Sequence, residues 1–490
     1  MHDLIISDIS VLLADGDIKE HQDVRISDGI IREICPHGTQ SGTAAQPMNS
    51  QTAGVQAPVQ SLIGQTADRQ PPVQSLIGQT ADRQASVQSF TSQAADNQSP
   101  VRQLSGQGKL LMPGLADCHM HTGQQLLKGR ILDELPMIWT RIMLPFESTL
   151  TPERMRLSAQ LAALEMIRSG TAAFIDAGSY FMEEAAQVYL TAGLRATLSA
   201  STMDQPGLPA SIAHTAKEAI AQTDRLYDAY HNKGLLKVAY SLRSLLSCSR
   251  ELILMAGERA KERHTLLQAH MNEYPNEVNY FLQHEACRPV EYLDSLNVLG
   301  PHFISAHSLL LSDHEKELLA AHDSKVCHCP FSNCGKGIPD TPGLQSRKIC
   351  VGLGTDGAAH GGLSLWNEMK IFRSVMNVHY GVAASNPAVM PAARILSMAT
   401  ANGYRLMGIP DGGTAAVGSK ADLITINLNQ PHLYPTGNIT NTLLECVTAS
   451  DVCDLIVDGK LIMKDRNVLT LDEEKILYEA KKYQEGLKHA

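Results

Sequence analysis

The chain has 490 residues, of which 43% are hydrophobic and 19% charged, and its formal net charge is −10. This length predicts one large domain with an accessory one, and the negative charge argues against a nucleic-acid partner, because phosphate contacts need clustered Lys and Arg. No run of 18 apolar residues is present, which argues against a membrane protein. The sequence starts with MHDLIISDIS, which lacks the basic region and apolar core of a signal peptide, so we expect a cytoplasmic protein. Its ten cysteines are then expected to be free thiols.

The two ends of the chain share one pattern of short alternating strands. Residues 3–35 alternate between apolar and polar positions, with turn signals at ADGD and SDG. The same alternation returns in VGSKADLITINL and DLIVDGKLIM near the other end. We expect residues 1–44 and 414–490 to pair into one small β-sandwich domain.

Residues 45–108 are repetitive. VQSLIGQTADRQ recurs with a spacing of 14, which keeps Val59, Val73, Val87 and Val101 in register. Four such units could stack as a small solenoid, but each offers about two bulky apolar side chains, too few to offset the entropy of ordering the chain. The sequence therefore predicts a mobile insertion within a connecting loop.

Residues 109–413 alternate between β-rich runs and helical patterns. One helical pattern, TPERMRLSAQLAALEMIRSG, has Thr151 as its N-cap and Gly170 after its end. Eight β/α units in series predict an α/β protein with a (β/α)8 TIM barrel as catalytic domain, and an open doubly wound sheet is the alternative. The eight runs are KLLMPGLADCHMH, TAAFIDAG, RATLSAST, LKVAYSLRS, TLLQAHMNE, HFISAHS, KVCHCP and ICVGLGTDG.

Polar side chains gather at the ends of these runs. In a TIM barrel the carboxyl ends of the strands surround one mouth, so residues at those ends should meet. Alternation along a strand also places two residues one position apart on the same face. The residues concerned are His119 and His121 in the first run, His270 and Glu273 in the fifth, His307 in the sixth and Asp356 in the eighth.

Three imidazoles and one carboxylate suit a divalent metal ion with one open position for water. We assign His119, His121, His270 and Asp356 as ligands, and zinc can lower the pKa of its water from 15.7 to about 7. Glu273 lies close enough to move a proton between hydroxide and substrate, and His307 to bond the hydroxide or the tetrahedral adduct. The plainer alternatives are a satisfied core histidine at 307 and an exposed loop charge at 273.

Two rival motifs overlap this region. Gly352, Gly354 and Gly357 have the GxGxxG spacing of a dinucleotide loop, although such a loop normally opens an early βαβ unit. CHCPFSNC resembles half of a zinc knuckle, but no second half follows. HExxH, GxSxG and GxxxxGK[ST] are all absent.

At these residues the sequence resembles the amidohydrolase superfamily, and within it the deaminases that include 5-methylthioadenosine/S-adenosylhomocysteine deaminases. The likeness lies in PGLADCHMHT, LPFESTLT, QAHMNE, SAHSLLL, PFSNCGKG, LGTDGAA and GSKADLITINL. It implies one zinc or iron ion on the four ligands, proton transfer from Glu273 to a ring nitrogen, and a water oriented and deprotonated by His307 and Asp356. It further implies that Glu147 binds ribose hydroxyls, that Trp139 lies near the substrate, and that the protein forms dimers or larger homo-oligomers.

Two positions depart from that pattern. Arg243 stands where the group has a substrate histidine, and Ala200 stands where it has an arginine. Arg243 could bind a carboxylate or carbonyl with its charged fork, or could be a solvated loop residue. The substrate therefore stays open among adenosine derivatives, guanine, pterins, cytosine and triazines.

The predicted function is that of a metal-dependent aminohydrolase which releases ammonia from a small N-heterocyclic substrate. One alternative is displacement of another leaving group, such as chloride from a triazine ring. The other is a non-catalytic binding protein with the same fold.

Overall fold

The computed structural model describes residues 4–39, 102–134 and 138–487. The predicted insertion, residues 45–108, lies outside these ranges up to residue 101. Of that segment only β4 (Arg102–Ser105) and the residues up to β5 (Lys109–Pro113) are described.

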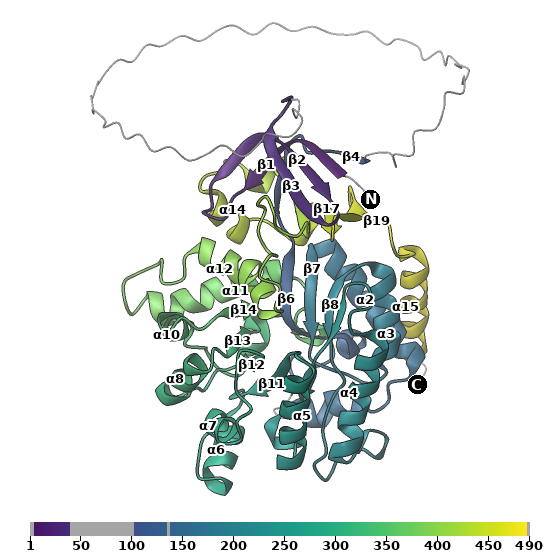
Figure 1. Cartoon of the computed structure of the whole chain (residues 1–490), viewed down its shortest axis with the longest axis vertical. Helices are drawn as coiled ribbons and strands as arrows, with labels where there is room; N and C mark the ends of the chain where they lie inside the picture. The colour runs from purple at the N-terminus through teal and green to yellow at the C-terminus, as the bar shows by residue number, and fades with distance from the viewer. Residues whose placement is uncertain (1–3, 40–101, 135–137, 488–490) are drawn as a thin grey trace, which may run out of the picture. The chain divides into compact units, whose positions relative to one another are not determined.

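The two ends of the chain meet in one mixed sheet of nine strands (Figure 1). Its order is β19-β18-β17-β16-β5-β1-β2-β3, and β4 pairs with β1. Ile6, Ile9 and Val11 of β1 are fully buried, which anchors the first strand in the sheet. The remaining strands are β1 (Leu4–Leu12), β2 (Ile18–Ser27), β3 (Ile30–Pro36), β16 (Leu423–Asn427), β17 (Val452–Val457), β18 (Lys460–Lys464) and β19 (Asn467–Val468).

The first β-rich run is two strands, so the prediction of a single strand there is wrong. β5 pairs antiparallel with β16 in the mixed sheet, whereas β6 (Leu115–His121) pairs parallel with β7. Gly114 separates them, and a Cβ on Gly114 would lie 2.5 Å from the Cβ of Ala172. The chain can pass from one sheet to the next only because this position has no side chain.

The other strands form two five-stranded parallel sheets, of order β15-β6-β7-β8-β9 and β10-β11-β12-β13-β14. Apart from β15, the last strand, which pairs with β6, the first, these strands follow chain order, unlike those of a doubly wound sheet, and this is the order of TIM-barrel-type folds. The predicted α/β class is confirmed. The strands are β7 (Thr171–Asp176), β8 (Arg195–Leu198), β9 (Leu236–Val238), β10 (Tyr240–Leu242), β11 (Leu267–Met271), β12 (Phe303–His307), β13 (Lys325–His328), β14 (Val351–Leu353) and β15 (Asp356–Gly357).

Helices connect and cover these strands (Figure 1). The caps predicted for α2 are confirmed: Thr151 accepts a bond from the Arg154 N–H, and Gly170 is left-handed at φ 83°. The helices between β6 and β16 are α1 (Leu144–Glu147), α2 (Pro152–Ser169), α3 (Met182–Ala192), α4 (Ala216–Tyr230), α5 (Arg250–Glu262), α6 (Pro275–His284), α7 (Pro289–Ser295), α8 (Asp313–Ala321), α9 (Pro330–Asn333), α10 (Thr341–Ser346), α11 (Leu365–Met376), α12 (Ala392–Met398) and α13 (Ala401–Leu406). Later come α14 (Ile439–Glu445) and α15 (Glu473–Leu487).

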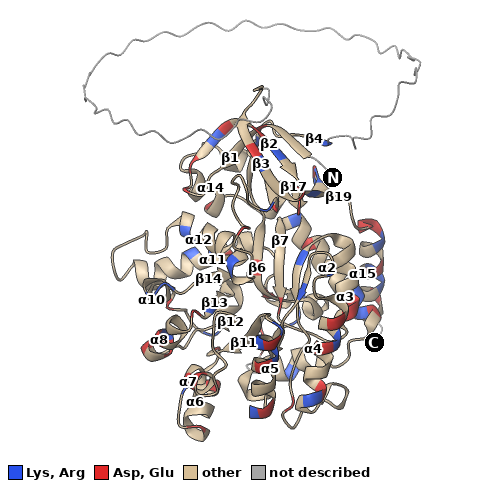
Figure 2. Ribbon diagram, in the orientation of Figure 1, with Lys and Arg blue, Asp and Glu red and all other residues tan. Residues whose placement is uncertain are grey.

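The largest buried cluster joins the helices to the parallel strands. Phe174 of β7 packs on Tyr189 of α3 at 4.7 Å between ring centroids, and Trp366 of α11 is fully buried. Charged side chains of both signs occur along α4 and α15 (Figure 2), the pattern of solvated helix faces. Within the described ranges, no helix combines the length and the apolar composition that a membrane crossing requires.

Candidate metal centre and active site

The carboxyl end of β6 carries the first two histidines of the site. His119 and His121 are buried, and their ring centroids are 5.1 Å apart. Alternation along the strand brings both rings to one face, as predicted. Neither ring nitrogen of His119 has a hydrogen-bond partner among the described residues. Buried polar atoms are nearly always bonded, so this imidazole is free to bind something other than protein.

His270 at the end of β11 and Asp356 at the start of β15 complete a group of four. One donor atom from each of the four side chains lies within 4.8 Å of the others. His121 Nε2 is 3.2 Å from His270 Nε2 and 3.3 Å from Asp356 Oδ1, and His119 Nε2 is 3.9 Å from the same oxygen. The structure therefore brings together the four predicted metal ligands.

The protonation states of these four side chains favour the binding of a cation. Burial, reinforced by the neighbouring histidines, lowers the pKa of His119 and of His270 well below the usual value. Burial would raise the pKa of Asp356, but a hydrogen bond from His121 and the nearby charge of Lys336 outweigh it and keep that pKa well below normal. Neutral imidazoles beside an ionised carboxylate are the donors that a divalent metal takes, so the set supports such a site.

Backbone strain marks the ends of the strands that carry the site. His307 and Asp356 have φ of 65° and 59°, in the left-handed region that non-glycine residues rarely adopt. Each such residue costs about 1–3 kcal/mol and persists only when its surroundings hold it. The packing around the strands thus sets the directions of these two side chains.

Glu273 and His307 lie side by side next to Asp356. His307 Nε2 is 3.6 Å from Glu273 Oε1, and the two form a second close group with Asp356. His307 is fully buried, and its Nδ1 is 3.0 Å from Asn333 Oδ1, so Nδ1 donates and Nε2 faces Glu273. Glu273 is half-buried and paired with Lys336, so the alternative of an exposed loop charge is wrong.

Three of the predicted substrate residues lie together beside His121, with Arg243 and Glu147 buried and Trp139 partly buried. Arg243, after β10, donates to Glu147 Oε1 at 3.0 Å and to His121 Nδ1 at 2.7 Å. Its guanidinium carbon lies 6.0 Å from the ring centroid of Trp139. The alternative of a solvated loop residue at 243 is therefore wrong. Glu147 Oε2 has no hydrogen-bond partner in the described part of the chain, so it can accept one from a ligand.

Two further side chains of the site were not predicted. Lys336 Nζ is 2.6 Å from Glu273 Oε1 and 3.6 Å from Asp356 Oδ2. His360 Nε2 is 3.8 Å from the latter oxygen. Both follow the seventh and eighth β-rich runs, so the rule that polar residues after the runs gather at one mouth could have found them.

The glycines of the GxGxxG motif have a packing role. A Cβ on Gly352 would lie 2.5 Å from Cys118 Sγ, and one on Gly354 would lie 2.7 Å from the carbonyl oxygen of His119. These glycines let β14 and the turn after it approach β6 closely, which explains them without a nucleotide. Cys327 and Cys329 are buried free thiols, and no described cysteine belongs to a candidate metal group.

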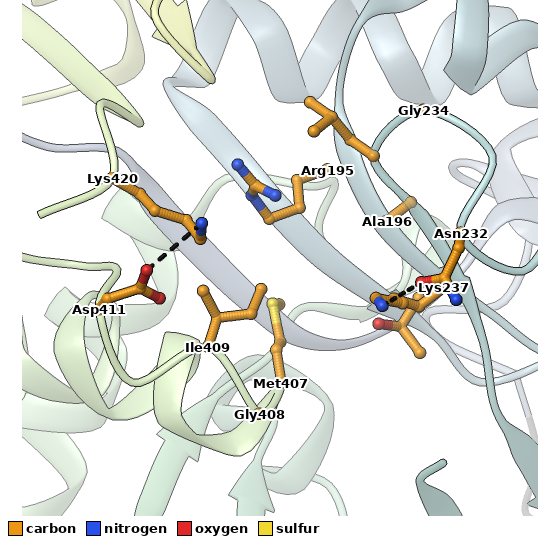
Figure 3. A pocket seen from close by; sticks show the side chains of 12 residues that line it. Arg195, Ala196, Asn232, Gly234, Lys237, Met407, Gly408, Ile409, Asp411 and Lys420 are labelled. Atoms are coloured by element: carbon orange, nitrogen blue, oxygen red, sulfur yellow. Dashed lines mark hydrogen bonds and ion pairs between the residues drawn. The ribbon is translucent and has the colours of Figure 1, made fainter. Parts of the chain in front are cut away.

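A separate cavity of about 290 Å³ contains none of the predicted site residues (Figure 3). Its charged side chains are bonded within the protein: Lys420 lies 3.3 Å from Asp411, Arg195 lies 2.7 Å from Asp422, and Lys237 donates to the side-chain oxygen of Asn232. Because those charges are already satisfied, this cavity does not compete with the histidine cluster as the candidate site.

The sequence model of the amidohydrolase family matches residues 110–462. The chain therefore belongs to the amidohydrolase family, and the predicted family and hydrolase class are confirmed. It is 32% identical to the 5-methylthioadenosine/S-adenosylhomocysteine deaminase of Dictyoglomus turgidum, over 77% of this chain and 88% of that one. It is 34% identical to the 5'-deoxyadenosine deaminase of Methanothermobacter thermautotrophicus, over 76% and 86% of the two chains.

Solved structures agree on a TIM-barrel-type fold. The zinc-bound adenosine deaminase from Xanthomonas campestris superposes with a TM-score of 0.81 at 23% identity, covering 100% of this chain and 99% of that one. The zinc complex of atrazine chlorohydrolase from Arthrobacter aurescens gives 0.79 at 17% identity, covering 98% and 99%. At these identities the likeness concerns the fold.

Proposed function

We propose that the protein deaminates an adenosine-type nucleoside, in which water replaces the amino group of the ring and ammonia leaves. The observation that carries this proposal is the convergence of three imidazoles and one carboxylate beside Glu273 and His307. The two relatives named above support the substrate class, since both are named as deaminases of adenosine derivatives. Their names also support hydrolysis of a C–N bond as the reaction.

The proposed cofactor is one zinc ion per chain, with iron as the alternative, held by His119, His121, His270 and Asp356. The unpartnered ring nitrogens of His119 support this fit. When bound, such an ion lowers the pKa of a water molecule from 15.7 to about 7 and so supplies a nucleophile at neutral pH. Zinc in the two structural neighbours supports the choice of ion.

Glu273, His307 and Asp356 are proposed to handle the protons. His307, whose Nδ1–H is bonded to Asn333, presents its other nitrogen to the water, and Asp356 helps to orient the water and remove its proton. Glu273, which is held as a carboxylate, takes a first proton from the water and delivers it to a ring nitrogen of the heterocycle, which makes the neighbouring ring carbon a better electrophile. The proton that Asp356 removes passes to the amino group, which leaves as ammonia.

Glu147, Arg243 and Trp139 are proposed to bind the rest of the substrate. Glu147 Oε1 already accepts from Gln124 and Arg243, so Oε2 is the atom that would take a ribose hydroxyl. Arg243 replaces the histidine expected at its position and would direct its remaining N–H groups to a carbonyl or carboxylate of the substrate. Trp139 would pack against the ligand.

The finer architecture belongs to the same proposal. β9 and β10 are edge strands of different parallel sheets, yet both come from the fourth β-rich run. β14 and β15 are the opposite edge strands of the two sheets, and both come from the eighth run. We infer that the two sheets close into one eight-stranded barrel over residues 109–413, apart from β5, which belongs to the mixed sheet. Residues 1–44 and 414–490 would then form the small β-sandwich domain. A cytoplasmic location and a homodimer or larger homo-oligomer stay predictions.

The test is turnover with a panel of adenosine derivatives, guanine, pterins, cytosine and chlorotriazines, followed by detection of ammonia and chloride. Purified protein should contain about one metal ion per chain, as one set of four ligands requires. His270→Ala should lose the metal and abolish ammonia release, while circular dichroism stays that of the wild type. Chloride release alone would favour the rival reaction. Metal-free protein with full activity would contradict the mechanism.

A further inference from the structure

We propose that Lys336 is a positioning residue of this active site, which fixes the carboxylate of Glu273 for proton transfer. The effect of Lys336 on catalysis rests on the proposed function. Lys336 Nζ lies 2.6 Å from Glu273 Oε1 and 2.6 Å from Ser332 Oγ. Both contacts have hydrogen-bond length, and the one to Glu273 joins opposite charges.

The burial of Lys336 indicates a specific role. Its side chain is only 7% exposed, and lysines are rarely buried unless they are paired. An ammonium group has three donors. Two of them bond Glu273 and Ser332, and Asp356 Oδ2 lies 3.6 Å from the same nitrogen. The ring centroid of Tyr274 is 5.5 Å from Nζ and covers the ammonium group further.

The charge of Lys336 is permanent at neutral pH. Burial alone would lower the pKa of Lys336, but the carboxylates of Glu273 and Asp356 outweigh that effect and raise the pKa above its usual value. Lys336 therefore acts as a fixed cation, and its role does not require it to gain or lose a proton.

One short segment after β13 contacts all three residues that are proposed to handle protons. Ser332 Oγ donates to Asp356 Oδ2 at 2.6 Å, and Asn333 Oδ1 accepts from His307 Nδ1 at 3.0 Å. Lys336 bonds Glu273 from the turn that follows α9, where its backbone N–H donates to the Asn333 carbonyl at 2.8 Å. The segment 332–336 thus sets the mutual geometry of acid, base and water-binding groups.

The ammonium group of Lys336 also argues against a second metal ion in this site. Glu273, His307 and Asp356 form a candidate metal group of their own. The ammonium group already contacts one of those carboxylates and lies near the other, so a metal ion there would meet a positive charge. We therefore expect a single metal ion per chain, on the four ligands assigned above.

Fixing Glu273 matters because proton transfer depends on short distances. A displacement of about 1 Å of a catalytic group can cost roughly a hundredfold in rate. The expected effect of Lys336→Met is therefore a fall in kcat of about a hundredfold with little change in KM, because Glu273 acts on the ring after the substrate is bound. The metal content of the variant should stay that of the wild type, since no ligand is removed.

A double-mutant cycle separates positioning from general damage. If Lys336 acts through Glu273, Lys336→Met should cost almost nothing further in an enzyme that already carries Glu273→Gln. Lys420→Met is the matched control, because Lys420 lies in the separate cavity of Figure 3 and pairs with Asp411. Should Lys336→Met fail to fold, Lys336→Gln keeps a donor without the charge. Additive losses in the cycle, or an unchanged kcat in the single variant, would overturn the proposal.

A structural measurement keeps this inference distinct from the proposed function. Crystal structures of metal-loaded wild type and Lys336→Met should differ in the position of the Glu273 carboxylate. A carboxylate at its wild-type position would overturn the role of Lys336, whatever the enzyme's substrate. A wild-type enzyme that deaminates nothing would instead refute the proposed function, and the two structures would still decide the role of Lys336.

Discussion

Two glutamates that follow β11, Glu273 in the loop and Glu277 in the first turn of α6, are held in opposite protonation states. Burial would raise the pKa of Glu273, but His307 and Lys336 outweigh it and lower that pKa. Burial raises the pKa of Glu277 to about 8, since hydrogen bonds from backbone N–H groups oppose it only in part. The difference arises from two neighbours of Glu273, His307 and Lys336, whereas Glu277 accepts the Glu273 N–H at 3.1 Å and has neither of them beside it.

Glu277 should make the stability of the protein fall as pH rises. Its folded pKa of about 8 exceeds the ordinary 4.5, so between these values the folded state keeps a proton that the unfolded state has released. Folding then loses about 1.4 kcal/mol for each pH unit in that window. Glu277→Gln should match the wild type near pH 4.5 and be more stable near pH 9.

Urea unfolding of both proteins at several pH values checks this expectation. Glu317→Gln serves as control, because Glu317 is exposed at the surface of α8. If the wild type and Glu277→Gln lose stability in parallel from acid to alkaline pH, Glu277 is not neutral in the folded protein.

At the scale of elements, close approach between β6 and the β14–β15 run places His119 next to Asp356. β15 pairs with β6 through Asp356 opposite Met120, while Gly354 lies against the backbone of His119. Two ligands that are 237 positions apart in sequence, as 356 minus 119 gives, thus become neighbours through one strand contact.

Gly354→Ala should weaken both this strand contact and the metal site. The new Cβ would lie 2.7 Å from the His119 carbonyl oxygen and 2.8 Å from its nitrogen, and backbone atoms there cannot move without separating the strands. We expect a loss of about 1–3 kcal/mol in the free energy of unfolding and a lower metal content. Gly437→Ala is the control, because nothing lies within 4 Å of its Cβ. Full metal content in Gly354→Ala would show that the contact is dispensable.

At the scale of the whole molecule, both ends of the chain contribute to one sheet, and the repeats fall between its third and fourth strands. β1, β2 and β3 precede residues 45–108, whereas β5 and β16 pair after them. The strands of the mixed sheet would therefore follow one another in the same order along the chain if the repeats were removed.

Removal of residues 50–100 should leave turnover and stability close to those of the wild type. The reason is compositional, because about two bulky apolar residues per repeat cannot form a core that other elements need. Steady-state kinetics and thermal unfolding of the shortened protein provide the measurement. A large fall in kcat would instead assign the repeats to a lid or a subunit contact.

Much of the fold and of the site followed from local patterns. Apolar periodicity and capping residues such as Thr151 and Gly170 predicted the β/α order, since these signals depend on neighbours a few residues away. The break at Gly114 was missed, because a run of apolar residues does not show in which of two sheets each half pairs.

The sequence by itself determined the α/β class and the family, and its motifs marked residues such as His119, His270 and Glu273. Only the tertiary structure decided the partners of these groups. Arg243 and Glu147 pair across 96 positions, and Lys336 reaches Glu273 across 63. Contacts of this kind depend on how loops from different strands meet at one edge. The local periodicity of the sequence contains no information about the distances between such loops.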